Sequence, residues 1–124
     1  FYDDGTFIIN TQGDVWAESY MGGNNECLLD EELVAPFDVY GSGEHSFSAT
    51  GAEITVNGLG AYIGFNKAYN GVELPGDGSG TPASTITYEV YEYSDVDGIQ
   101  RLTITVAYGS ETDPDYWNMR MISE

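Results

Sequence analysis

Acidic and aromatic side chains alternate along residues 14–20, where their spacing could serve sugar chemistry. Trp16, Glu18 and Tyr20 are two residues apart, so in a β-strand all three side chains would point to the same face. Hydrolysis of a glycosidic bond needs two carboxyl groups, and Glu18 between two aromatic rings is the first candidate. The chain holds 21 Asp and Glu residues, so carboxylates alone do not identify a glycosidase.

Other kinds of catalysis lack the groups that they need. His45 is the only histidine, no G-x-S-x-G turn is present, and one His with one Cys is too few for a metal hydroxide. We therefore predict that the protein is not an enzyme and has no catalytic cofactor. A structural Ca²⁺ stays open as an alternative, because three acidic clusters could supply oxygen ligands. These clusters are Asp3–Asp4, Asp30–Glu32, and Asp113 with Asp115.

Residues 58–71, GLGAYIGFNKAYNG, place three glycines around an apolar run. Gly58, Gly60 and Gly64 follow a G-x-G-x-x-x-G spacing, which differs from the G-x-G-x-x-G of dinucleotide-binding turns. The turn-rich residues that follow cannot form the helix whose N-terminus would face a phosphate. The glycines therefore indicate a bulged or closely approached strand, and Asn70-Gly71 indicates a turn.

A neutral ligand with many hydroxyl groups fits the remaining side chains best. A sugar ring stacks its apolar face on an aromatic side chain, while amides, acids or a lysine at the edge bind its hydroxyls. The candidate platforms are Trp16, Tyr20, Tyr62, Tyr69 and Trp117, and the candidate edge groups are Glu18, Asn66, Lys67 and Asn70. Two alternatives stay open: the tryptophans could belong to the core, and Lys67 could pair with an acid.

The charge of the chain limits its partners. The formal net charge of −18 disfavours nucleic acid and anionic membranes. Sulfated or uronic polysaccharides are disfavoured as well, unless Lys67, Arg101 and Arg120 cluster. No apolar run in the sequence is long enough for a membrane-spanning helix. We expect a monomer, and we expect Cys27, which has no disulfide partner, to be a small buried residue.

Strands must position most of these side chains. Residues 85–93 and 100–108 alternate apolar and polar side chains around Asp97-Gly98, which is the strongest hairpin signal in the chain. Strict alternation in the first of these strands places Tyr91 and Tyr93 on the same face.

Shorter strands are predicted at residues 6–11, 14–20, 44–49, 52–57, 61–65 and 115–122. Gln12-Gly13 and Thr50-Gly51 would join the first four of these into two hairpins. A helical turn is predicted within 28–34, and a long Gly/Pro/Ser loop at 71–84. The pattern predicts an all-β fold: an antiparallel, jelly-roll-like β-sandwich, or alternatively a small lipocalin-like up-and-down barrel. We expect residues 1–124 to form one domain.

Three stretches resemble a known kind of domain: W-x-E-x-Y at 16–20, GAYIG-x-x-K-x-x-NG-x-E at 60–73, and PAS-x-ITYE at 82–89. Over nearly its whole length the chain resembles a small all-β accessory domain of secreted and surface proteins from marine polysaccharide-degrading bacteria. Such domains are found beside laminarin-type β-glucanases of glycoside hydrolase family 16, or beside PKD-type β-sandwich modules. The resemblance implies an accessory role in carbohydrate use, in a secreted or cell-surface protein.

We therefore expect a non-catalytic carbohydrate-binding module that recognises a neutral polysaccharide, first of all a β-glucan such as laminarin. Stacking on aromatic rings and side-chain hydrogen bonds would hold the ligand. We also expect a covalently linked catalytic or PKD-type domain, because Phe1-Tyr2-Asp3-Asp4 reads like the interior of a longer multimodular protein. Two alternatives stay open: a structural or protein-docking accessory domain, and a small glycoside hydrolase that uses Glu18.

Overall fold

This computed structural model describes residues 1–110 and 112–123, without the side chains at 110 and 114. Its regular structure consists of ten β-strands and three 3₁₀ turns. The strands are β1 (Thr6–Ile9), β2 (Asp14–Ala17), β3 (Glu26–Leu29), β4 (Gly43–Ala49), β5 (Glu53–Asn57), β6 (Ala68–Tyr69), β7 (Val72–Glu73), β8 (Thr85–Val96), β9 (Ile99–Ser110) and β10 (Asp113–Ile122). The 3₁₀ turns are η1 (Ser19–Met21), η2 (Asp30–Glu32) and η3 (Phe37–Tyr40). Within this described part of the chain, no helix could span a membrane. The fold is all-β, as the alternation predicts.

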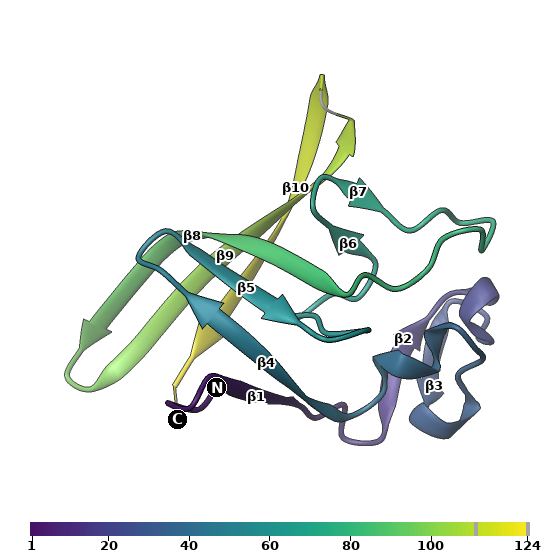
Figure 1. Cartoon of the computed structure of the whole chain (residues 1–124), viewed down its shortest axis with the longest axis horizontal. Coiled ribbons are helices and arrows are strands. Elements are labelled where there is room, and N and C mark those ends of the chain that lie inside the picture. Colours follow the sequence, from purple (N-terminus) through teal and green to yellow (C-terminus); the bar gives the residue numbers. More distant parts are fainter. Residues whose placement is uncertain (111, 124) are drawn as a thin grey trace.

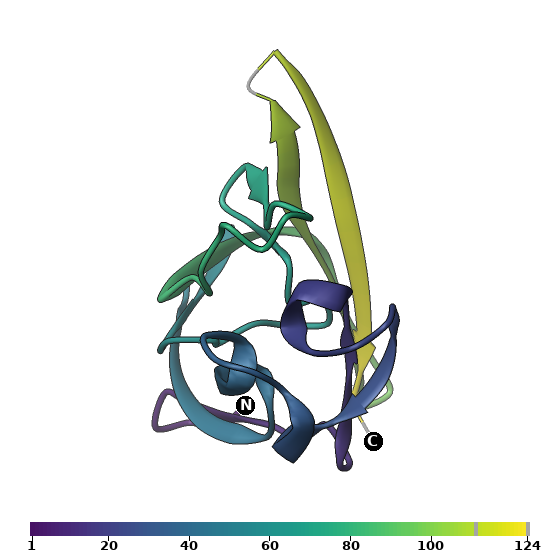
Figure 2. The same cartoon turned by 90° about the vertical axis from the view of Figure 1, so that its right-hand side faces the viewer.

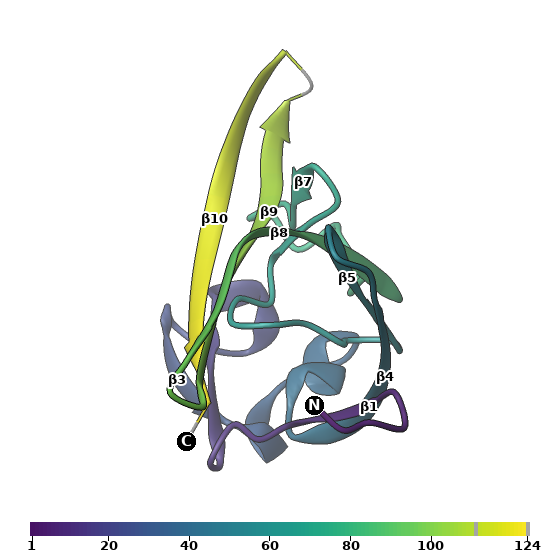
Figure 3. The same ribbon diagram turned by 90° about the vertical axis from the view of Figure 1, so that its left-hand side faces the viewer.

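Six strands form one antiparallel sheet in the order β1-β4-β5-β8-β9-β10. The sheet curls into an open arc whose two edges are β1 and β10 (Figure 1, Figure 3). The pairs β2–β3 and β6–β7 form two small sheets. β2–β3 and the 3₁₀ turns lie together on the right-hand side of Figure 1, which is the side that faces the viewer in Figure 2. A curled sheet of this kind is compatible with either a sandwich or a barrel-like fold.

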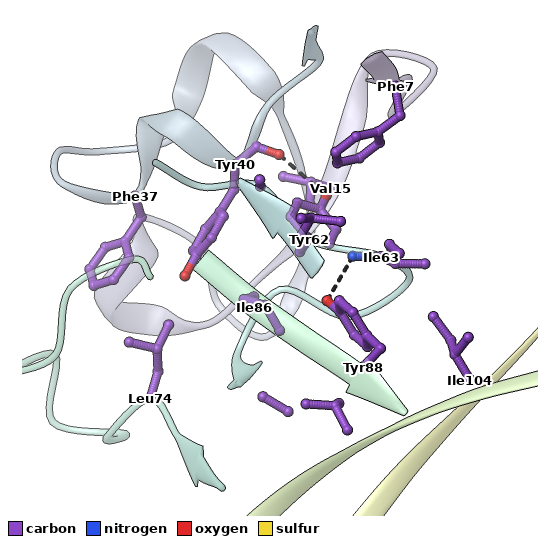
Figure 4. Close-up of a cluster of buried hydrophobic side chains, with 14 of the residues drawn as sticks. Phe7, Val15, Phe37, Tyr40, Tyr62, Ile63, Leu74, Ile86, Tyr88 and Ile104 are labelled. Carbon is purple, nitrogen blue, oxygen red and sulfur yellow. Dashed lines mark hydrogen bonds between the residues drawn. The ribbon is translucent and has the colours of Figure 1, made fainter. Parts of the chain in front are cut away.

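The hydrophobic core lies on the concave side of the arc, where side chains from the sheet meet those of the turns and of residues 58–66. Figure 4 labels ten of its members, which are Phe7, Val15, Phe37, Tyr40, Tyr62, Ile63, Leu74, Ile86, Tyr88 and Ile104. Because the concave face is filled by these side chains, the alternate residues of the long strands are directed to the outer face.

The hairpins predicted around Asp97-Gly98 and Thr50-Gly51 are confirmed. β8 pairs with β9 from Glu89–Thr105 to Val96–Ile99, and Asp97 and Gly98 both have positive φ, as a two-residue type I′ turn requires. β4 pairs antiparallel with β5, and β10 covers the strand predicted at 115–122.

The hairpin predicted around Gln12-Gly13 is wrong, although the chain does turn there with positive φ at both residues. β1 pairs with β4 and β2 pairs with β3, so the two strands beside the turn belong to different sheets. The hydroxyl of Thr11 donates to Asp30 at 2.7 Å and lies 2.8 Å from that of Ser42. These partners are distant in the sequence, so local alternation could not reveal them.

The strand predicted at 61–65 is also wrong. Gly58, Gly60 and Gly64 have φ of 131°, 78° and 75°, which an extended strand does not contain. The segment instead crosses the inside of the arc (Figure 3). The buried N–H of Ile63 donates to the hydroxyl of Tyr88 at 2.9 Å (Figure 4), so a side chain supplies the partner that a sheet would have supplied.

The segment around Cys27 differs from its prediction in two ways. Cys27 lies on β3 and is exposed, so the expectation of a buried thiol is wrong. The helical turn predicted within 28–34 is reduced to the 3₁₀ turn η2, because Leu28 and Leu29 pair with β2. The strand-forming contacts of these leucines override their helical preference.

A β-bulge interrupts the pairing of β8 with β9. Val90 lies opposite Ile104 and Glu92 lies opposite Thr103, so Tyr91 is an extra residue on β8. Tyr91 and Glu92 both face outward, while Tyr93 lies opposite Leu102 and lines an inner apolar depression with it. The prediction that Tyr91 and Tyr93 share a face is therefore wrong.

The first residues of β8 and the last residues of β9 do not pair with each other, and the Asn70-Gly71 turn of β6–β7 lies between them. Asn70 Nδ2 donates to the carbonyl of Thr85 at 2.7 Å, and the N–H of Thr87 donates to Asn70 Oδ1 at 3.0 Å. The N–H of Gly71 donates to the carbonyl of Ala107 at 2.9 Å. The asparagine side chain thus replaces a neighbouring strand along β8.

Replacing Asn70 by alanine should lower the free energy of unfolding by about 3 kcal/mol. Two side-chain hydrogen bonds to the backbone are lost, each worth about 1 kcal/mol, and an alanine at φ 47° adds about 1 kcal/mol of strain. Asn25→Ala is the matched control, because Asn25 has a φ of 58° and its side chain makes no hydrogen bond to a described residue. Urea denaturation should separate the variants by about 2 kcal/mol; equal losses would contradict the role given to the Asn70 side chain.

Candidate functional site

The five aromatic platforms predicted from the sequence differ in their access to solvent. Trp16 on β2 is 45% exposed and Trp117 on β10 is 39% exposed, so neither tryptophan is a core residue. Tyr62 is only 8% exposed, and its hydroxyl donates to the carbonyl of Tyr40 at 3.3 Å (Figure 4). Tyr62 is therefore part of the core and has no ring face to offer a ligand.

Tyr20 and Tyr69 are half-buried and pack against the core. The ring of Tyr20 meets that of Phe37 edge to face at 5.1 Å. Burial raises the pKa of Tyr20 to about 12, and the charge of Glu18 acts in the same direction. Both tyrosines therefore stabilise the fold and present little ring surface to a ligand.

Lys67 pairs with acids, as one of its two alternatives predicts. Its Nζ lies 2.5 Å from Glu18 Oε1 and 3.0 Å from Glu73 Oε1. Partial burial lowers the pKa of Lys67, but the hydrogen bonds and charges of Glu18 and Glu73 outweigh it and raise the pKa above its ordinary value. The ion pairs tie the end of β2 to β7, so Glu18 and Lys67 hold these elements together.

The two asparagines of the predicted site are bound to the backbone. Asn66 is buried, and its Nδ2 donates to the carbonyl of Trp16 at 3.4 Å. Asn70 bridges Thr85 and Thr87, as described above. The predicted edge groups therefore meet in one region, but their polar atoms are engaged in holding three sheets together.

Trp117 belongs to a stack of aromatic rings at the inner face of β10. Its ring centroid lies 4.6 Å from that of Phe65 and 5.6 Å from that of Tyr108. Lys67 Nζ lies 5.9 Å from the centroid of the Phe65 ring, so Trp117 is connected through Phe65 to the Lys67 ion pairs. This region offers an aromatic surface, but the predicted edge groups already have protein partners.

A different surface combines exposed aromatic rings with free polar groups. A groove of about 540 Å³ lies on the outer face of β8, β9 and β10. We call it the tyrosine groove, because Tyr91 and Tyr116 are its most exposed rings, at 78% and 53%. Its lining consists of Glu89, Tyr91, Thr103, Thr105, Tyr116, Asn118 and Arg120.

The register of the three strands explains how these residues come together. Thr105 lies opposite Glu89 on one side and Asn118 on the other, and Thr103 lies opposite Arg120. Every second residue of each strand faces outward, which brings polar side chains of three strands into rows across the sheet. The bulge adds Tyr91 to this outer surface.

Thr105 lies at the floor of the tyrosine groove. Its side chain lines the groove although the residue is only 7% exposed. Its hydroxyl is buried and has no hydrogen-bond partner among the described residues. A buried hydroxyl without a partner costs roughly 1–3 kcal/mol, so a ligand that supplied a partner would regain part of this cost.

Sequence reasoning named none of the groove residues as ligand-binding. The alternation at 115–122 does place Asn118 and Arg120 on one face, and Tyr116 continues that face by one step. The sequence pattern that could have indicated this groove is therefore a row of polar residues on one strand face that ends in an aromatic residue. The sequence prediction instead chose Trp117, which lies on the inner face of β10, and Trp16, which lies on β2.

Among the described residues, no group of three or more His, Cys, Asp or Glu side chains could hold a metal ion. A structural Ca²⁺ stays a prediction.

The chain matches no protein-family model, no curated protein and no solved structure.

Proposed function

We propose that the protein is a non-catalytic carbohydrate-binding module that holds a neutral polysaccharide in the tyrosine groove. The observation that carries the proposal is the placement of two exposed tyrosines in one open groove that is also lined by Thr105, whose buried hydroxyl has no partner among the described residues. Sugar chains need this combination, because each ring has an apolar face and a rim of hydroxyl groups.

In this proposal Tyr91 and Tyr116 stack on sugar rings, and the groups between them fix the orientation of the chain. Thr105 exchanges a hydrogen bond with a sugar hydroxyl at the floor. Asn118 can both donate and accept, Glu89 accepts, and Arg120 donates. The module relies on few contacts, so we expect a dissociation constant between about 1 µM and 1 mM.

The charges of the groove favour a neutral chain as the ligand. The lining holds one acid, Glu89, and one base, Arg120, so its formal charges cancel although the whole chain carries −18. A β-glucan such as laminarin is the first ligand to test, and it fits the accessory role in a secreted or surface polysaccharide-degrading protein that the sequence resemblance implies. Tethering to an enzyme would raise the effective affinity of such a weak module.

Alanine at Tyr91 or Tyr116 should weaken binding of laminarin about tenfold each, because a ring that stacks on a sugar contributes on the order of 1 kcal/mol or more. Affinity electrophoresis against laminarin, mixed-linkage glucan, agarose and alginate measures the effect. Tyr2→Ala is the control, since Tyr2 is 54% exposed but lies outside the groove. Retardation by none of the polymers, or a double Tyr91/Tyr116 variant that binds normally, would overturn the proposal.

Thr105→Val should change stability and binding in opposite directions. Valine keeps the shape and removes the unpartnered hydroxyl, so we expect unfolding free energy to stay equal or rise by about 1 kcal/mol. Affinity for laminarin should fall about fivefold, which corresponds to one lost hydrogen bond.

Thr55→Val is the matched control for this test. Thr55 is partly buried, lies outside the groove, and its hydroxyl lies 3.0 Å from that of Thr87, so its removal leaves a partner unsatisfied. This control should lose stability and keep its affinity. If Thr105→Val binds as tightly as the unchanged protein, Thr105 is not a ligand contact.

A further inference from the structure

Two of the three basic residues of the chain lie side by side at one end of the tyrosine groove. Arg101 on β9 and Arg120 on β10 line a common depression of about 370 Å³. Arg101 lies opposite Ile122 and Thr103 lies opposite Arg120, so the arginines are diagonal neighbours, about 7–8 Å apart at the backbone. Long side chains reach across such a distance.

Neither arginine forms an ion pair with any carboxylate that the structure describes. Lys67, by contrast, is held by two acids. Glu92 lines the same depression, yet it lies beyond ion-pair distance of both guanidinium groups. With two bases and one acid, the depression carries a local charge of about +1 on a molecule of −18.

Two unpaired guanidinium groups on adjacent strands suit an oxyanion. Each presents N–H donors in a planar fork that matches the oxygens of a sulfate or carboxylate. Ser94 and Thr103, which also line the depression, can donate further hydrogen bonds. Repulsion from distant acids is screened, because the Debye length is about 8–10 Å at 0.10–0.15 M salt.

We propose that this depression is a subsite for an anionic substituent, a sulfate ester or a carboxylate, on the polysaccharide whose backbone lies in the tyrosine groove. Arg120 lines both the groove and the depression, so a chain that occupies the groove carries its next substituent toward Arg101. The inference uses the proposed function for the backbone only, and the anion subsite can be tested apart from it.

The test compares three polymers with one backbone: laminarin, sulfated laminarin and laminarin oxidised to carry carboxylates. Their affinities are measured at low and at high ionic strength. We expect one of the anionic forms to bind roughly tenfold more tightly than laminarin at low salt, with the advantage reduced at high salt. The form that gains more identifies the anion.

Arg101→Gln should remove most of this advantage and leave the affinity for laminarin unchanged, because Arg101 does not line the groove. Gln12→Glu lowers the net charge by the same amount on an exposed turn and should keep the advantage. If the anionic polymers bind no better than laminarin, or if both variants respond alike, the anion subsite is overturned.

The remaining outcomes separate the two proposals. Binding of an anionic polymer alone, dependent on Arg101, supports the subsite and contradicts the neutral ligand. Binding of laminarin with no gain from either anion supports the proposed function and overturns the subsite. Binding of none of the three polymers overturns both.

Discussion

Gly60→Ala should remove about 4 kcal/mol from the free energy of unfolding, a large share of the roughly 5–15 kcal/mol that stabilises a domain of this size. Gly60 has a φ of 78°, which costs alanine about 1–2 kcal/mol. A Cβ atom there would lie 2.4 Å from the carbonyl oxygen of Val39, so two backbone segments would have to move apart. Overpacking of this kind costs about 1–3 kcal/mol more.

Alanine substitutions at two other glycines distinguish the backbone strain from the overpacking. At Gly51 an added methyl group would meet no neighbouring atom and φ is not positive, so Gly51→Ala should be neutral. Gly71 has the same open space but a φ of 88°, so Gly71→Ala should show only the backbone strain of about 1 kcal/mol. Urea denaturation should rank the losses as Gly51, Gly71, Gly60 in increasing order. A Gly60 variant no worse than the Gly71 variant would contradict the close contact with Val39.

Lys67→Met should cost about 2 kcal/mol, the second large effect on stability. Methionine preserves most of the packing but leaves two partly buried carboxylates, Glu18 and Glu73, without a counter-charge. Arg101→Met is the control, because Arg101 is exposed and forms no ion pair with a described residue; it should change stability by less than about 0.5 kcal/mol. Equal stability of the two variants would show that the ion pairs contribute nothing.

The dependence on pH gives a second measurement of the same ion pairs. The pKa of Lys67 is raised in the folded protein, so its contribution is complete below the unfolded pKa of about 10.4 and is lost as the pH rises through the folded value. Burial also raises the pKa of Tyr62 and Tyr88 to about 12, which lowers stability above about pH 10 in every variant. The difference between the unchanged protein and Lys67→Met should therefore shrink at alkaline pH, whereas a constant difference would contradict the ion-pair account.

The long strands could be predicted from the sequence because their alternation is local. The hairpin at Asp97-Gly98 needs only a turn dipeptide and two runs of period two, and β8 and β9 follow from them. The segment 58–66 could not be predicted in this way. Its conformation depends on a hydrogen bond from Ile63 to Tyr88 and on contact with Val39, partners that lie far away in the chain.

The candidate site also has features that the sequence could predict and features that depend on distant partners. Residue types alone selected Glu18, Asn66, Lys67 and Asn70 as groups able to bind a sugar, but their partners in the fold engage their polar atoms. Thr105 carried no signal of its own, because an unpartnered hydroxyl can be recognised only once its neighbours are known. Tyr91 was predicted only to share a face with Tyr93, and the bulge places it instead on the outer face, in the same groove as Tyr116.

The bulge at Tyr91 divides β8 into two halves of opposite phase. Before it, even-numbered residues such as Tyr88 point inward, and after it odd-numbered residues such as Tyr93 do so. Deleting one residue at position 91 would restore a single phase by removing the groove tyrosine, while every later pair of the hairpin stayed in register with β9. An insertion or deletion elsewhere in the strand would turn one half inside out. Deletion of one residue is therefore tolerable at the bulge, and that position is the one where the proposed binding surface would be lost.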